Sequence, residues 1–151
     1  MNGVTRITSE QDIMMITFTA QAAASLSDVL TAFAEKGIVV DMICQNAPRA
    51  ATFDFSFTLS ANYFDTAMQT IGAYRAGAGS APLISSGYSK INLFGEEMVS
   101  SCGVAALALR TLREAEIEIS LITTSDLDIS LLVRAENEDR ALDVLRAAFA
   151  V

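Results

Sequence analysis

Apolar and polar positions along the chain follow two periods, and both periods occur in each half of the sequence. An alternation of two residues predicts two strands whose inward faces carry Phe53, Phe55, Phe57 and Leu59, and Leu127, Ile129, Leu131 and Val133. A spacing of i, i+3, i+4, i+7 predicts four amphipathic helices, over residues 26–33, 64–71, 104–112 and 141–149. Short apolar runs at 14–18 and 91–94 predict further strands, and so does the segment 83–86, which follows the breaker-rich stretch 76–82.

The recurrence of these patterns is an internal repeat. The apolar positions Ile38, Val40, Met42 and Ile43 coincide with Ile117, Ile119, Leu121 and Ile122 at an offset of 79 residues (117 − 38). Further on the offset falls to 74 (128 − 54), where Asp54 meets Asp128. Each copy therefore reads as strand, helix, strand, strand, helix, and the run 83–86 adds a fourth strand to the first copy.

The second copy lacks a fourth strand of its own, because Val151 follows its second helix directly. An uncovered sheet edge presents unpaired N–H and C=O groups, so another segment is expected to cover it. The run 4–8 has no other place in the repeat. We therefore expect an α+β fold of two ferredoxin-like (βαββαβ), interlaced units with antiparallel sheets and helices on one face. The first unit is residues 9–87, and the second is residues 88–151, completed by strand 1–8.

Composition narrows the classes of function. A net charge of −8, from 18 acids and 10 bases, argues against nucleic acid as a partner, and no apolar run is long enough to cross a membrane. Histidine is absent, which removes the usual nucleophilic pairs and the commonest zinc ligand. Met98 and Cys102 stand without a C-x-x-C pair, so no metal site is expected. We expect a cytoplasmic, non-catalytic protein whose two cysteines are buried thiols.

The strand faces opposite the predicted helices are mostly polar. In the first copy they carry Asp41, Ile43, Gln45, Asp54 and Ser56, and in the second Glu118, Ser120, Ile122, Thr124, Asp128 and Ser130. Small polar side chains with isolated aliphatics suit contact with another sheet or a hydrated interface.

Three motifs carry a more specific signal: VDMICQN at 40–46, GEEMVSSCGVAA at 95–106 and LITTSDLDIS at 121–130. They resemble V-D-M-I-x-Q-N, G-x-x-M-x-S-x-x-G-V-A-A and M-I-S-T-S-E-x-x-I-S of the tandem ACT domains at the C-terminus of aspartate kinases (aspartokinases). The resemblance covers nearly all of the chain.

This resemblance implies regulation. In aspartokinases the ACT units pair, usually with those of a second subunit, into side-by-side sheets, and lysine or threonine binds there to shut down the kinase. The implied partners are a second copy in a homodimer through the ACT sheets, an aspartate kinase catalytic domain or subunit, and an amino-acid effector. The chain itself is expected to be no enzyme and to hold no cofactor, because ATP and Mg would belong to a kinase domain whose phosphate-binding motifs are absent here.

The loop before a helix has a physical reason to bind an amino acid, because unpaired N–H groups at a helix N-terminus attract a carboxylate. Carboxyl or amide side chains on a neighbouring strand then take the ammonium group. By resemblance and by position, the candidate effector-binding residues are Asp41, Gln45, Asn46, Met98, Ser100, Gly103, Val104, Glu118, Ile119, Thr124 and Ser125.

Three departures from the family pattern keep a second reading open. The family's D-x-P-G is replaced by residues Gln21–Ala24, and its effector-region asparagine is Val39 in the first copy and Glu118 in the second. Glu118 is still able to pair with an ammonium group, whereas Val39 is not. Ser125, Asp126 and Asp128 suit a tight turn as well as a ligand. The alternative function is therefore a structural dimerisation module with a degenerate effector site.

Overall fold

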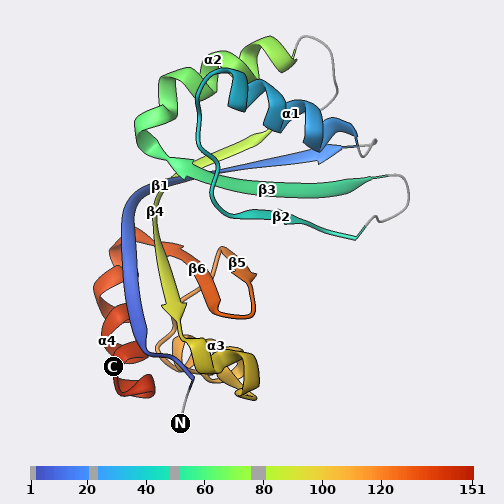
Figure 1. Ribbon diagram of the computed structural model, residues 1–151. Helices are drawn as coiled ribbons and strands as arrows, with labels where there is room; N and C mark the ends of the chain where they lie inside the picture. The colour runs from blue at the N-terminus through green and yellow to red at the C-terminus, as the bar shows by residue number, and fades with distance from the viewer. Residues whose placement is uncertain (1–2, 21–23, 48–51, 76–80) are drawn as a thin grey trace. The chain divides into compact units, whose positions relative to one another are not determined.

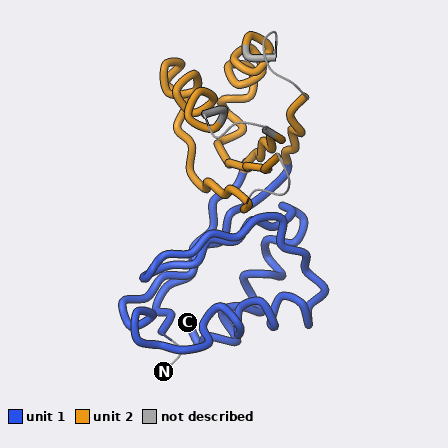
Figure 2. Tube along the Cα trace, turned by 90° about the vertical axis from the view of Figure 1, so that its right-hand side faces the viewer, with its two compact units in different colours: residues 1–11, 87–151 blue, residues 12–86 orange. Residues whose placement is uncertain are grey.

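The computed structural model describes residues 3–20, 24–47, 52–75 and 81–151 (Figure 1). The chain divides into two compact units (Figure 2). Unit 2 comprises residues 12–86, and unit 1 combines residues 1–11 with residues 87–151. These bounds differ by one to three residues from the division at 9–87 and 88–151 drawn from the sequence.

In unit 2 the strands lie in the order β2-β3-β1-β4, with β3 antiparallel to both of its neighbours and two helices over the apolar face of the sheet (Figure 1). Its elements are the second part of β1 (Arg6–Ala20), α1 (Ala24–Glu35), β2 (Ile43–Gln45), β3 (Phe53–Ser60), η1 (Ala61–Tyr63), α2 (Phe64–Arg75) and the start of β4 (Leu83–Phe94). Phe57 is completely buried and packs edge-on against Phe33 of α1, with ring centroids 5.2 Å apart. Aromatic packing between β3 and α1 thus forms the centre of this unit.

Unit 1 has the strand order β1-β4-β6-β5, with both helices on one face (Figure 2). After β4 the chain runs through η2 (Glu96–Ser100), α3 (Val104–Glu114), β5 (Leu121–Thr124), β6 (Asp128–Arg134), η3 (Ala135–Asn137) and α4 (Glu138–Phe149). The N-terminal segment joins this sheet, and the Thr5 N–H donates to the Phe94 carbonyl at 2.8 Å. Leu112, Leu131 and Leu145 are fully buried and belong to one core.

The fold class predicted from the sequence is confirmed: two α+β units of alternating strands and helices, interlaced because unit 1 takes its first strand from the N-terminus. Residues 6–8 of the predicted run 4–8 and all of the run 14–18 belong to a single strand β1, and the segments 83–86 and 91–94 are parts of β4. Asp12 and Gly87 lie within these strands at φ +56° and +79°. A left-handed residue shifts the alternation, which is why each strand looks like two in the sequence.

Two local predictions are wrong. Leu127 is 40% exposed and precedes β6, because its carbonyl accepts the Gly95 N–H at 3.0 Å in a turn instead of joining the strand. The cysteines are free but not buried: Cys44 is half-buried on the edge strand β2, and Cys102 is exposed in the turn before α3. The other predicted inward positions of β3 and β6 are buried. Within the residues described, no helix is long and apolar enough to cross a bilayer.

Candidate functional site

A cavity of about 320 Å³ lies in unit 1 between the N-terminus of α3, the η2 turn and the β5–β6 hairpin. The residues that line it are Met98, Val99, Ser101, Gly103, Val104, Ala105, Ala106, Thr124, Ser125, Asp126 and Ile129. Five of the candidates chosen from the sequence are among them: Met98, Gly103, Val104, Thr124 and Ser125.

The α3 wall presents backbone donors to this cavity. Gly103 is the N-cap residue at φ +86° and offers no side-chain cap. The Leu107 N–H donates to the Gly103 carbonyl at 2.9 Å, so residues 104–106 form the first turn and their N–H groups have no acceptor one turn earlier in the helix. The positive end of the helix dipole therefore faces the cavity without a capping side chain.

The hairpin wall combines a fixed turn with an exposed acid. The Ser125 hydroxyl accepts the N–H groups of Leu127 (3.2 Å) and Asp128 (3.1 Å) and donates to the Asp128 carboxylate. The Asn92 amide also donates to that carboxylate at 2.9 Å. Ser125 and Asp128 thus hold the turn, which leaves the exposed Asp126 as the ionised side chain at the cavity edge.

The η2 wall includes two lining residues that the sequence candidates missed, Val99 and Ser101. Ser100 does not line the cavity; it is exposed and donates to the Glu97 carbonyl at 3.3 Å. Its neighbour Ser101 lines the cavity, and its hydroxyl donates to the same carbonyl at 2.8 Å. The motif predicts a serine in this turn. Which of the two neighbouring serines faces the cavity depends on the 3₁₀ backbone geometry, which the sequence does not reveal.

Glu118 and Ile119 lie outside the cavity lining. Glu118 is exposed in the segment before β5, whereas Ile119 is half-buried and packs against the unit 1 core. Neither side chain is brought to the N-terminus of α3 as a lining group.

The candidates of the first copy lie along the edge of the unit 2 sheet. Asp41, Gln45 and Asn46 are exposed on and beside β2, and the backbone N–H groups of Asp41 and Asn46 donate to β3 carbonyls at 2.9 Å. These side chains line none of the cavities described for this chain. The departure at Gln21–Ala24 falls mostly on residues 21–23, which lie outside the described residues.

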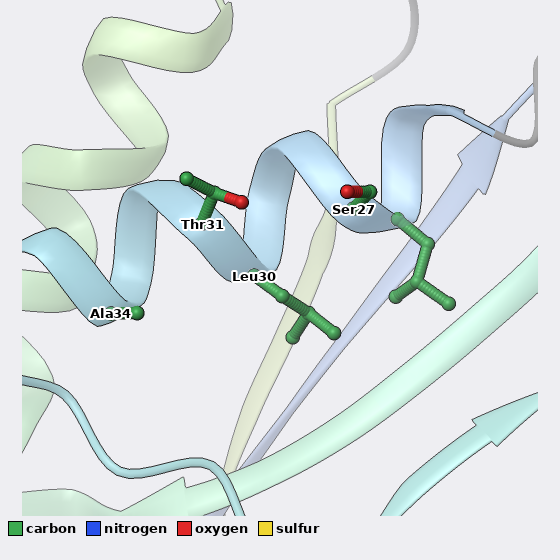
Figure 3. A pocket seen from close by; sticks show the side chains of 5 residues that line it. Ser27, Leu30, Thr31 and Ala34 are labelled. Carbon is green, nitrogen blue, oxygen red and sulfur yellow. The ribbon is translucent and has the colours of Figure 1, made fainter.

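Unit 2 has two further hollows. A groove of about 560 Å³ runs along α1 and is lined by Leu26, Ser27, Leu30, Thr31 and Ala34 (Figure 3). Its lining has no ionised side chain to select a ligand. A second hollow, of about 370 Å³ between α1 and α2, includes Glu35 and Lys36 in its lining, but none of the candidate residues chosen from the sequence lines it. The unit 1 cavity is therefore the better candidate for a charged small molecule.

One buried acid in unit 1 stands apart from the cavity. Glu138, at the first residue of α4, accepts hydrogen bonds from the Ser9 and Ser89 hydroxyls at 2.7 Å each. Burial acts to raise the pKa of Glu138, but hydrogen bonds from Ser9, Ser89 and Gln11 outweigh it and hold the pKa below the usual glutamate value. Among the described residues, no cluster of three or more His, Cys, Asp or Glu side chains is arranged to hold a metal ion.

Comparison with known proteins shows which proteins this chain resembles. The model of the ACT domain matches residues 91–149. The aspartokinase of Geobacillus stearothermophilus is 31% identical over 125 residues, which cover 83% of this chain and 30% of the relative. The aspartokinase of Mycolicibacterium smegmatis is 33% identical over 124 residues. The chain spans only about 30% of the length of these curated relatives.

Solved structures match the chain from end to end. The ligand-free regulatory subunit of aspartate kinase from Thermus thermophilus superposes with a TM-score of 0.90 at 26% identity, over 97% of this chain and 99% of that one. A chain in the structure of aspartokinase alpha and beta subunits is 31% identical, with a TM-score of 0.86, over 98% of this chain and 99% of that one. Sequence motifs, repeat, fold and these likenesses agree, and the chain belongs to the regulatory ACT-domain family of aspartate kinases.

Proposed function

We propose that the chain is an amino-acid-sensing and dimerisation module of aspartate kinase. In this proposal lysine or threonine binds in the unit 1 cavity, and its binding changes the activity of an aspartate kinase catalytic domain or subunit. The module acts through binding alone and needs no cofactor of its own. The membership of the regulatory family and the chemistry of the cavity support this role.

The observation that carries the proposal is the pairing of opposite charges across the cavity. The first-turn N–H groups of residues 104–106 attract an α-carboxylate, and the Asp126 carboxylate attracts an α-ammonium group. A free amino acid carries both groups one carbon apart. The volume of about 320 Å³ lies near the lower end of ligand pockets, which span about 300–1,000 Å³.

The lining favours threonine over lysine. Asp126 is the one ionised side chain in it, and the α-ammonium group of either ligand would use this acid. The second ammonium group of lysine would then lack an anionic partner among the lining residues. Threonine instead offers a hydroxyl that suits Thr124 and a methyl group that suits Met98.

Calorimetric titration of the chain with L-threonine, L-lysine and L-methionine tests the proposal. Asp126→Asn removes the charge of one hydrogen-bonded pair worth about 1.5–3 kcal/mol, so the Kd for threonine is expected to rise roughly 10- to 100-fold. Asp143→Asn, at an exposed position on α4 away from the cavity, is the matched control and should leave the Kd unchanged. No binding of any of the three amino acids would reject the sensing role.

The dimerisation part of the proposal rests on the edge of the unit 2 sheet. β2 is an edge strand whose first residue, Ile43, is 45% exposed, and Val39, four residues earlier, is 66% exposed. An edge strand with exposed aliphatic side chains is suited to pairing with a second copy. Sedimentation equilibrium should give a dimer for the wild type and a weaker one for Ile43→Lys. A wild-type monomer at high concentration would contradict this part alone.

The kinase partner requires its own test. The relatives include a structure described as a regulatory subunit of aspartate kinase and another of alpha and beta subunits, which is why a kinase chain is the proposed partner. Adding the chain to an aspartate kinase catalytic subunit, with and without threonine, should make its activity threonine-dependent. If a saturating concentration of the chain leaves the kinase rate unchanged, with and without threonine, that result would argue against the regulatory role.

A further inference from the structure

Gly95 joins two walls of the unit 1 cavity. Its N–H donates to the Leu127 carbonyl of the β5–β6 hairpin at 3.0 Å. Its own carbonyl accepts the Met98 N–H of the η2 turn at 3.1 Å. The hairpin and the η2 turn both contribute lining residues, so the position of this single glycine fixes how the two walls are held together.

Residues Gly3–Thr5, called the N-terminal strap below, touch Gly95 directly. A Cβ atom built on Gly95 would lie 1.7 Å from the Gly3 carbonyl oxygen and 3.0 Å from the Val4 Cα. Only a residue without a side chain permits two backbones to approach so closely. Gly95 is therefore glycine because of the strap, since its extended φ of −175° is open to any residue.

The other side of the strap touches the η2 turn. A Cβ atom on Gly3 would lie 2.9 Å from the Ser101 hydroxyl oxygen and 3.3 Å from the Met98 Cα. Ser101 and Met98 both line the cavity. The strap thus lies against Gly95 and against two residues of the turn that line the cavity.

The strap is also fixed to the rest of unit 1. Val4 is 6% exposed and belongs to the unit core. The Thr5 N–H and hydroxyl both donate to the Phe94 carbonyl, at 2.8 and 3.3 Å, one residue before Gly95. Because the strap is closely packed and hydrogen-bonded within unit 1, a shift of Gly95 is expected to move the η2 turn instead of being absorbed by a loose strap.

We propose that the N-terminal strap is a positioning element for the cavity, with Gly3 and Gly95 as the positioning residues. The strap sets the spacing between the η2 turn and the hairpin, and the affinity for an amino acid depends on that spacing. Coupling between two sites is reciprocal, so a ligand in the cavity also holds the strap more tightly. The inference rests on the proposed function for its ligand, but the mechanical link between strap and turn does not.

The experiment combines binding with amide exchange in the full chain, with L-threonine as the probe. Gly95→Ala places a methyl group on the strap backbone and is expected to raise the Kd for threonine roughly 5- to 150-fold, the usual range of such coupling. In the wild type, saturating threonine should slow exchange of the Thr5 amide. Gly72→Ala and Gly37→Ala are matched controls, because nothing lies within 4 Å of the added Cβ in either and both are in unit 2. Both should leave the Kd within about twofold, although Gly37, at φ +70°, loses stability through strain.

A milder variant covers the case in which Gly95→Ala does not fold. A Cβ added at Gly3 meets the Ser101 hydroxyl oxygen at 2.9 Å, a contact that Ser101→Gly removes, and the Met98 Cα at 3.3 Å, which remains. The φ of +72° at Gly3 adds backbone strain, and Gly37→Ala, at φ +70° in unit 2, is the control for that strain. Faster exchange at the Met98 amide in Gly3→Ala, partly reversed in the double variant and absent in Gly37→Ala, supports the link between strap and turn even if no amino acid binds the wild type and the proposed function fails. Unchanged Met98 exchange, or wild-type threonine affinity in a folded strap variant, overturns it.

Discussion

Replacing Glu138 with alanine is expected to destabilise unit 1 by about 3–6 kcal/mol, a large loss for a single side chain. Glu138 is 6% exposed, and its two oxygens accept hydrogen bonds from Ser9 on β1 and Ser89 on β4. The carboxylate thus ties the first turn of α4 to the two neighbouring strands of the unit 1 sheet.

The magnitude follows from these contacts. A hydrogen bond to a charged acceptor contributes about 1.5–3 kcal/mol, and two are lost. The Ser89 hydroxyl is completely buried, so it would remain without an acceptor in the absence of water. Glu138→Gln keeps the volume and one carbonyl acceptor, so its expected loss is only about 1–2 kcal/mol.

The assay is urea denaturation, joined to amide exchange that reports each unit separately. Exchange should become faster in β6 of unit 1 and change little in β3 of unit 2. Glu136→Ala, at an exposed position two residues earlier, is the control and should cost less than about 0.5 kcal/mol. A loss below about 1 kcal/mol for Glu138→Ala would refute the assignment of these hydrogen bonds to stability.

Remaining predictions concern pH and the unit 2 core. Since hydrogen bonding holds the pKa of Glu138 below its unfolded value of about 4.3, its contribution is present above that pH and is lost as pH falls through the folded pKa. The stability difference between wild type and Glu138→Gln should therefore shrink below about pH 4.3 in urea titrations; a constant difference would contradict it. Phe57→Ala should cost about 3–5 kcal/mol in the same assay, because the ring is completely buried. Thr58→Val should cost about 1–3 kcal/mol, because the Met42 N–H then loses its acceptor at 3.0 Å; a neutral result would mean that water replaces the hydroxyl.

The repeat and the inward strand faces were predictable because alternation reports them directly. Phe55 and Phe57 in one copy and Ile129 and Leu131 in the other are buried as the two-residue period requires. The joining of the strands was not predictable, because a left-handed residue such as Asp12 breaks the period that identifies a strand.

The role of Glu138 was invisible in the sequence. An acid at the start of a helix is ordinary, and the equivalent position of the first copy is Phe64, which is 46% exposed. Its partners Ser9 and Ser89 lie 129 and 49 residues away in the chain. Periodicity reports which face a residue occupies, but not which distant polar group it meets there.

Only some of the candidate site residues could be predicted from the sequence. Met98, Val104 and Thr124 line the cavity because the motif places them at the ends of elements that meet in the fold. Glu118, selected by alignment with a motif, is exposed in the segment before β5 and does not line the cavity. Motif resemblance identifies the elements of a site more reliably than the individual side chains.

Under the proposed function the departures at Val39 and Glu118 bear less on sensing, because the proposed ligand lies in the unit 1 cavity. Both residues are exposed, and neither lines the cavity in unit 1. The proposed carboxylate-binding groups there are backbone N–H groups of residues 104–106, which a substitution of side chains does not remove. The choice between a sensor and a degenerate dimerisation module consequently depends on the unit 1 cavity. Asp126, as the one ionised lining residue, is the side chain whose replacement separates the two readings.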